Sequence, residues 1–330
     1  MKLGHTNKLL SGVLLALGAC GVAQADTTYT YAYSYNWSVP GSCAGGVWHD
    51  ECALSGGTPT LTSSTSSDGS SVPADPHAPG AISSTATGWA NTNGGGDPQY
   101  QTIEQGQVQA WGGSGGYGLG IKNADAATGG DPNEGNAPEH AVDNNDRYDS
   151  MLYSFSDAVA LTSVLVTYSN TDIDYSLSDI IVLAYTGSDP FINDANNSGT
   201  KLAGLTYGQL VNEGWTLVGN YANLGAGETR SINTGTTTGG NTYAGIASSS
   251  YWLIGAANNL VAGGANNCGS WGSPSCTSTL FDAVKLGSLG ATVTTTNTTH
   301  NGGSVPEPGS LVLMGLGSLL LVRTRARKSC

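Results

Sequence analysis

Apolar positions in much of the chain alternate with polar or small residues at a period of two. In residues 28–39, which read TYTYAYSYNWSV, every second position from 29 to 37 is aromatic. Successive side chains of a strand point to opposite faces, so the pattern predicts one aromatic face made by Tyr29, Tyr31, Tyr33, Tyr35 and Trp37. We expect a strand that covers a core. The other interpretation is a ladder of rings that stacks on sugars, with Tyr33 and Trp37 as the glycan contacts.

Further strands are predicted where short apolar or alternating runs end at clusters of Gly, Asn, Asp and Ser. Residues 54–79 are rich in Ser, Thr, Pro and Gly, which is typical of a long surface loop, and residues 201–212 predict a short helix or turn. Many short strands without long helical periodicity indicate an all-β protein with a single β-sandwich, jelly-roll-like, in residues 26–290. The strands are expected at residues 82–90, 100–111, 150–155, 160–168, 177–185, 215–221, 231–233, 250–256 and 283–286.

The amino-terminal end has the layout of a secretory signal peptide. Lys2 and Lys8 precede the apolar stretch Leu9–Ala23, and Ala23-Gln24-Ala25 forms a small-x-small cleavage site. Residues 1–25 are therefore a targeting segment that the Sec translocon would use, and they are left out of the fold. A lipoprotein box around Cys20 is the alternative, but the glycine before this cysteine fits it poorly.

The carboxyl-terminal end carries a second apolar run. Residues 309–322 contain no charge, and a basic cluster follows at Arg323, Arg325, Arg327 and Lys328. As a helix the run would be roughly 20 Å long at about 1.5 Å per residue, which is short against a hydrocarbon core of about 30 Å. Basic residues stay on the cytoplasmic side, so the body of an exported chain would lie outside the inner membrane. A buried core helix with a solvated basic end is the alternative.

A Pro-Glu-Pro motif stands just before this run, as Val305-Pro306-Glu307-Pro308. Motif, apolar run and basic tip at the end of a chain closely resemble the PEP-CTERM sorting signal of Gram-negative bacteria. The resemblance implies processing of the tail, residues 305–330, by the membrane enzyme exosortase. It also implies an intermediate tethered transiently to the inner membrane by a hydrophobic sorting helix, and a final place at the cell surface or in the extracellular matrix.

Four stretches of the body, residues 139–144, 214–221, 249–256 and 281–286, resemble in their order a family of exosortase-dependent surface proteins. That family has no established activity, so the resemblance concerns location and architecture. Between body and tail, residues 291–304 are rich in Thr and low in charge, and we expect a flexible stalk there.

Charge excludes one class of function. Five of the 11 basic residues and 23 of the 24 acidic residues lie in residues 26–304, which gives this body a formal charge of −18. Nucleic-acid binding needs basic patches, so it is not expected. Such an acidic body suits divalent cations and stays soluble after export.

The four cysteines of the body form two local pairs, Cys43 with Cys52 and Cys268 with Cys276. An exported protein meets an oxidising compartment, so we expect disulfides, and the local pairing is favoured because each pair would close a tight Gly-rich loop. A zinc site at Cys43, Cys52 and His49 is the alternative, although the spacing fits no common zinc pattern.

Two acidic segments are candidate calcium ligands. Asp143 and Asp149 lie in DNNDRYD, and Asp172, Asp174 and Asp179 lie in NTDIDYSLSD. Alternate oxygens can converge on one hard cation, although an EF-hand is excluded because its glycine is missing and its distal glutamate has no counterpart. The alternative is a pair of solvated strand ends with Asx turns.

Catalytic patterns are weak. Gly112–Gly116 fits the nucleophile elbow and Gly113–Gly118 the dinucleotide fingerprint, but both patterns need a helix after the loop, and none is predicted. His140 lies close in sequence to several acidic residues, and we expect it to be a structural residue of a turn. We therefore expect no enzyme but an exported structural or adhesive protein that works with exopolysaccharide, as in a biofilm. The alternative is a carbohydrate-binding or carbohydrate-active module that uses the aromatic strand face.

Overall fold

The computed structural model describes residues 26–34, 54–66, 82–94, 96–113, 116–127, 131, 134, 141–171, 177–235, 247–264 and 282–295. All of them except Asp26 belong to one compact unit, Thr27–Thr295. Several predicted features lie outside the described residues: both chain ends with the sorting motif and the basic cluster, Trp37, Asp172, Asp174, His140 and the cysteines at 43, 52, 268 and 276. Among the described residues, no helix is long and apolar enough to cross a membrane.

Strands make up most of the described chain, which confirms the all-β prediction. The strands are β1 (Thr27–Ser34), β2 (Leu54–Ser66), β3 (Ser84–Asn93), β4 (Thr102–Gly113), β5 (Gly116–Lys122), β6 (Val142–Asp143), β7 (Asp149–Thr171), β8 (Leu177–Tyr185), β9 (Trp215–Gly225), β10 (Glu228–Ser231), β11 (Ser249–Ala256) and β12 (Asp282–Thr295). Three short 3-10 helices are η1 (Pro98–Tyr100), η2 (Ala124–Ala127) and η3 (Tyr207–Glu213).

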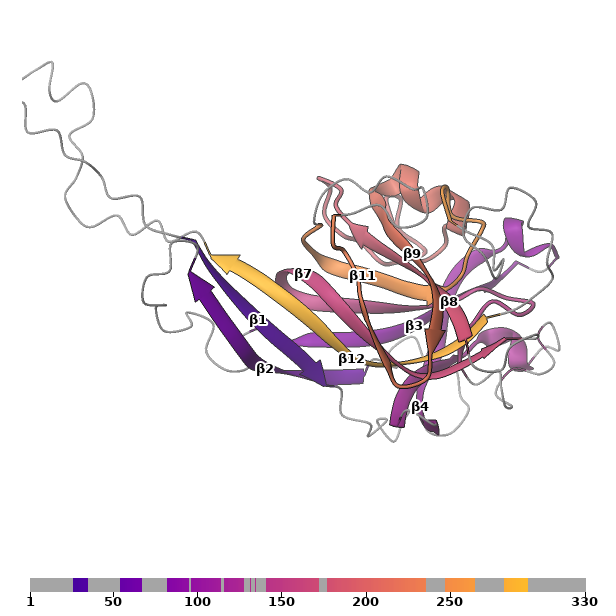
Figure 1. Cartoon of the computed structure of the whole chain (residues 1–330). Coiled ribbons are helices and arrows are strands. Elements are labelled where there is room, and N and C mark those ends of the chain that lie inside the picture. Colours follow the sequence, from indigo (N-terminus) through magenta and orange to yellow (C-terminus); the bar gives the residue numbers. More distant parts are fainter. Residues whose placement is uncertain are drawn as a thin grey trace, which may run out of the picture. The chain divides into compact units, whose positions relative to one another are not determined.

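The jelly-roll-like sandwich is not what the pairings form. β1 pairs with β2, β2 with β3, β3 with β7, β7 with β12, and β12 again with β1, so these five strands close a ring. Figure 1 shows β1 between β2 and β12. β4 and β5 make a second path from β3 to β12, and β11, β8 and β9 continue from β7. A sandwich needs two separate sheets, whereas here the ladder runs continuously around the ring.

Two segments that were expected as a loop and a stalk contain strand residues. The Ser/Thr-rich segment expected as a loop contains β2, which pairs with β1 over eight positions from Thr27↔Ser66 to Ser34↔Thr58. The stalk was expected from residue 291, but β12 extends to Thr295 and pairs there with Thr27. Thr is a good strand former when a partner strand is present, so a polar Thr-rich run does not by itself indicate a loop.

Two cores lie on opposite faces of the central strands, and β8 shows how. Ile180, Val182 and Ala184 belong to the larger core, which also includes Tyr153, Trp252 and Val284. Ile181, Leu183 and Tyr185 belong to the smaller core, together with Trp215 and residues of η3. Period-two alternation sends neighbours to opposite faces, so a strand covered on both faces reads as a continuous apolar run.

Tyr33 is not a glycan contact. Tyr29, Tyr31 and Tyr33 are 1%, 4% and 0% exposed and belong to the larger core. The ring of Tyr33 meets that of Phe155 edge to face, with centroids 5.1 Å apart. The aromatic face of β1 thus covers a core, as expected, and it offers no ring to a sugar. This removes Tyr33 from the carbohydrate-binding alternative.

The glycine loop at 112–118 is a hairpin. Gly113 pairs with Gly116 at the end of the β4–β5 ladder, and strand β5 follows the turn. The helix that a nucleophile elbow or a dinucleotide fingerprint requires does not follow. Gly118 is needed for packing, because a Cβ atom there would lie 1.9 Å from Oγ1 of Thr167.

Candidate metal centre

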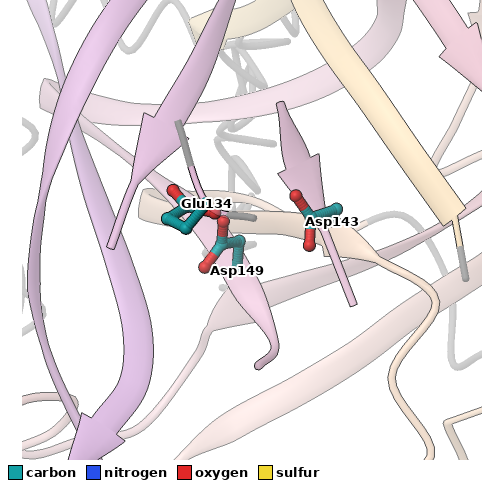
Figure 2. Close-up of side chains that lie close together, drawn as sticks. All are labelled: Glu134, Asp143 and Asp149. Carbon is teal, nitrogen blue, oxygen red and sulfur yellow. The ribbon is translucent and has the colours of Figure 1, made fainter. Parts of the chain in front are cut away.

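Three buried carboxylates converge in the described structure. Glu134, Asp143 and Asp149, here called the acid triad, are 5%, 1% and 1% exposed. Each offers a carboxylate oxygen, and these oxygens all lie within 4.8 Å of one another. Figure 2 shows the carboxyl group of Asp143 facing those of Glu134 and Asp149.

The turn between β6 and β7 brings the two aspartates together. Asp143 ends β6, where it pairs with Ala283 of β12, and Asp149 begins β7, where it pairs with Ala90 of β3. Inside the turn, the backbone N–H of Asn145 donates to Oδ1 of Asp143 at 3.1 Å, and Asp146 has a left-handed φ of 56°. Asx turns and left-handed conformations are natural for these residues, so the DNNDRYD sequence itself makes the reversal.

Asn123 holds the third carboxylate in place. Its backbone N–H donates to Oε1 of Glu134 at 2.8 Å, and its side-chain Nδ2 donates to Oδ2 of Asp131 at 2.9 Å. Asn123 directly follows β5 and is fully buried. The segment with Asp131 and Glu134 is thereby attached to the end of a core strand.

The cation nearest in sequence is engaged elsewhere. Arg147 lies in the turn between the two aspartates, but its Nε donates to Oδ2 of Asp125 at 2.6 Å and its Nη1 to the carbonyl of Asp146 at 2.8 Å. Both Arg147 and Asp125 are largely buried. The guanidinium therefore binds the turn to η2 through Asp125.

Electrostatics inside the site oppose ionisation. Burial raises the pKa of Asp143 well above its usual range, and the neighbouring carboxylates of Asp149, Glu134 and Asp131 raise it further. Burial likewise raises the pKa of Asp131, although the hydrogen bond from Asn123 partly offsets this. Like charges in a desolvated place destabilise one another, so the site favours a bound proton or a bound cation.

Two carboxylate oxygens in this region have no hydrogen-bond partner in the part of the chain that the structure describes. They are Oδ2 of Asp143 and Oδ1 of Asp131, and both are buried. A buried polar atom without a partner costs about 1–3 kcal/mol, so native proteins normally satisfy such atoms. A hard cation is one group that would do so here.

The described acids of the calcium prediction fall into two groups. Asp143 and Asp149 lie together, whereas Asp179 lies apart from them and forms a second buried group with Asp282, here called the acid pair. Asp282 Oδ1 accepts from the backbone N–H of Asp179 at 2.8 Å, and Asp179 Oδ1 accepts from that of Asn223 at 2.8 Å. Asp179 is therefore not part of the site that Asp143 and Asp149 form.

Glu134 was missed by the sequence prediction. It lies in an acidic, turn-rich segment, GGDPNEGN, whose spacing to Asp143 and Asp149 matches no known ligand loop. Its Gly, Asn and Pro residues indicate turns and do not indicate an ion ligand. Only the folded structure shows which acids face Asp143.

A separate pocket of about 300 Å³ lies near β3 and β4. Its lining includes Trp89, Glu104, Asn193, Asp194 and Asn196. Trp89 is only 5% exposed, so it presents little ring surface on which a sugar could stack. The pocket therefore gives the carbohydrate-binding alternative no support.

Comparison with known proteins bears on the tail. Residues 304–328 match the PEP-CTERM protein-sorting motif. The motif marks an exported protein that is sorted by an exosortase and passes through a membrane-anchored intermediate. No curated protein and no solved structure matches the chain.

Proposed function

We propose that this chain is a non-enzymatic surface or extracellular-matrix protein of a Gram-negative bacterium, with a structural or adhesive role in exopolysaccharide. The observation that carries the proposal is the sorting motif at residues 304–328. Two properties of the body support it. The formal charge of −18 in residues 26–304 keeps an exported domain soluble. Each of the five strands of the ring pairs with a neighbour on both sides, so none of these five is an open edge on which the domain could aggregate.

The physical role of each tail segment follows from its chemistry. Pro306 and Pro308 keep the motif extended, because a residue before proline avoids the helical region. An extended segment beside the membrane surface is accessible to a processing enzyme. The short apolar run, residues 309–322, holds the chain in the membrane only until that enzyme acts, and the basic cluster prevents its export.

The mass of the carboxyl-terminal peptide tests the proposal. Protein is extracted from the surface of cells with and without the exosortase, and its terminal peptide is measured by mass spectrometry. We expect loss of everything after the Val305–Pro308 region only when the enzyme is present, and any added mass would identify the attachment. Replacing Glu307 by Ala should prevent processing, whereas Ser310→Ala, just inside the apolar run, should not. A terminus that is intact to Cys330 would contradict the proposal and make the tail a simple anchor.

A further inference from the structure

We propose that the acid triad, Glu134, Asp143 and Asp149, binds one calcium ion, which fastens the segment with Glu134 to the β6–β7 turn. The proposal does not rest on the sorting of the tail. It concerns the body alone and would hold for any location outside the cytoplasm.

The spacing of the triad fits a single ion. Calcium binds oxygen at 2.3–2.6 Å, so two ligand oxygens on one ion lie at most about 5.2 Å apart. The triad oxygens lie within 4.8 Å of one another. The three side chains all lie in residues 134–149 but on different elements, so one ion would fasten Glu134 to the end of β6 and the start of β7.

Within the triad, the carboxylate of Asp143 is the group that points to a bound cation. Asp143 is 1% exposed, faces Glu134 and Asp149, and has one carboxylate oxygen, Oδ2, without a hydrogen-bond partner among the described residues (Figure 2). Its other oxygen is already used by the backbone N–H of Asn145. Transfer of a carboxylate to a buried place is costly unless a counter-charge is present, and Arg147, the basic side chain in the turn, is bound to Asp125.

Calcium is the cation that the donor set favours. The triad offers only carboxylate oxygens, which suit calcium, magnesium or manganese rather than zinc or copper. Magnesium keeps several waters and demands near-octahedral geometry, which three buried side chains suit poorly. Calcium accepts more oxygens in irregular geometry. Asp131, which Asn123 binds together with Glu134, has a buried Oδ1 without a hydrogen-bond partner among the described residues and would be a further candidate donor.

The ion would complete an existing framework. Asn123 ties Asp131 and Glu134 to the end of β5, and Arg147 ties the β6–β7 turn to η2 through Asp125. These contacts position Glu134 and the β6–β7 turn without joining them to each other. The calcium ion would join them through their carboxylates, which otherwise repel one another.

The experiment is a calcium titration of the full chain after treatment with a chelator, followed by calorimetry and by thermal unfolding. We expect binding with a Kd of about 10⁻⁴ M or tighter, the upper end being that of extracellular calcium modules. Calcium at a hundred times the Kd should raise Tm by about 5 °C. Asp143→Asn and Glu134→Gln, which keep side-chain size, should each weaken binding at least tenfold.

Asp179→Asn is the matched control, because it changes a buried aspartate outside the triad and should leave calcium affinity unchanged. A variant that fails to fold would be recognised by its lost near-UV circular dichroism, and the other triad variant then decides. The proposal is overturned if the wild-type chain shows neither heat nor a Tm shift with millimolar calcium. It is equally overturned if Asp143→Asn and Glu134→Gln bind as tightly as the wild type, or if magnesium binds and calcium does not. None of these results depends on whether the tail is processed.

Discussion

The acid triad and the acid pair are both buried groups of carboxylates, yet they differ in the hydrogen-bond donors that surround them. In the pair, backbone N–H groups donate to Asp179 and Asp282, and Asn144 donates from Nδ2 to Oδ2 of Asp282 at 3.5 Å. In the triad, Oδ2 of Asp143 has no such donor among the described residues. Burial and proximity of acids therefore do not define a cation site. What matters is whether the fold has already supplied the donors.

The two groups are also neighbours in the ladder. Asp143 pairs with Ala283 of β12, and Asp282 is the residue before it. Asn144, the residue after Asp143, accepts from the backbone N–H of Asp282 at 2.7 Å and donates to the carbonyl of Ala257 at 2.7 Å. The two groups thus meet at consecutive residues, because Asp143 belongs to the triad and Asn144 binds Asp282 of the pair.

Breaking the pair at Asn144 should have the largest effect on stability. Asn144→Ala removes the acceptor for the N–H of Asp282 and the donor to the carbonyl of Ala257 in a buried place, which should lower the free energy of unfolding by about 2–3 kcal/mol. Urea denaturation of the full chain measures it. Asn196→Ala, on an exposed loop, is the control and should change stability by less than about 0.5 kcal/mol. An equal loss in both variants would mean that Asn144 does not organise the pair.

The sequence predicts strands well where burial dictates composition. β8 was expected at residues 177–185 and spans Leu177–Tyr185, because a strand covered on both faces must be apolar throughout. β2 was missed, since its Ser, Thr and Gly residues carry no apolar alternation. The ring closure was also missed. It depends on β1 meeting β12, more than 250 residues away, and no local pattern encodes that pairing.

The same limit applies to the candidate site. Asp143 and Asp149 were predicted together because one turn joins them, and a turn is a local feature. Asp179 was placed with them wrongly, because its partners, the backbone N–H of Asn223 and the carboxylate of Asp282, come from distant strands. Glu134 was missed because its position depends on a hydrogen bond from the backbone N–H of Asn123. Any residue can supply a backbone N–H, so the sequence does not reveal this contact.

Neutralising one aspartate of the triad and one of the pair should change the free energy of unfolding by different amounts when calcium is absent. In the presence of a chelator, Asp143→Asn should raise the free energy of unfolding by about 1–2 kcal/mol, because it removes a buried charge that faces two others. Asp179→Asn should change it by less, since its amide oxygen still accepts from Asn223. Urea denaturation of both variants beside the wild type gives the two differences. Equal stabilisation would show that the hydrogen bonds of the pair do not distinguish it from the triad.

The smallest effect should appear in the pH dependence of the pair. Burial raises the pKa of Asp282 well above its usual range, with a further rise from Asp179, and the N–H of Asp179 and the Asn144 side chain offset part of this. Burial also raises the pKa of Asp179, although Asn223 and Arg230 lower it again. Since a raised pKa means that the folded chain holds its proton more tightly than the unfolded chain, stability falls as pH rises from about 4 toward the folded pKa and is level above it.

Replacing Asp282 by Asn removes this titration while Oδ1 still accepts from Asp179. The free energy of unfolding, measured in urea between about pH 4 and pH 7, should fall less steeply than in the wild type, by at most about 1.4 kcal/mol per pH unit, the value for one proton. The triad contributes equally to both chains, so the difference in slope belongs to Asp282. Asp157→Asn, at an exposed position of β7, should keep the wild-type slope. If the stability of Asp282→Asn fell with pH as steeply as that of the wild type, Asp282 would be ionised in the folded chain without loss of stability. The contrast between the pair and the triad would then rest on the unsatisfied oxygen of Asp143 alone.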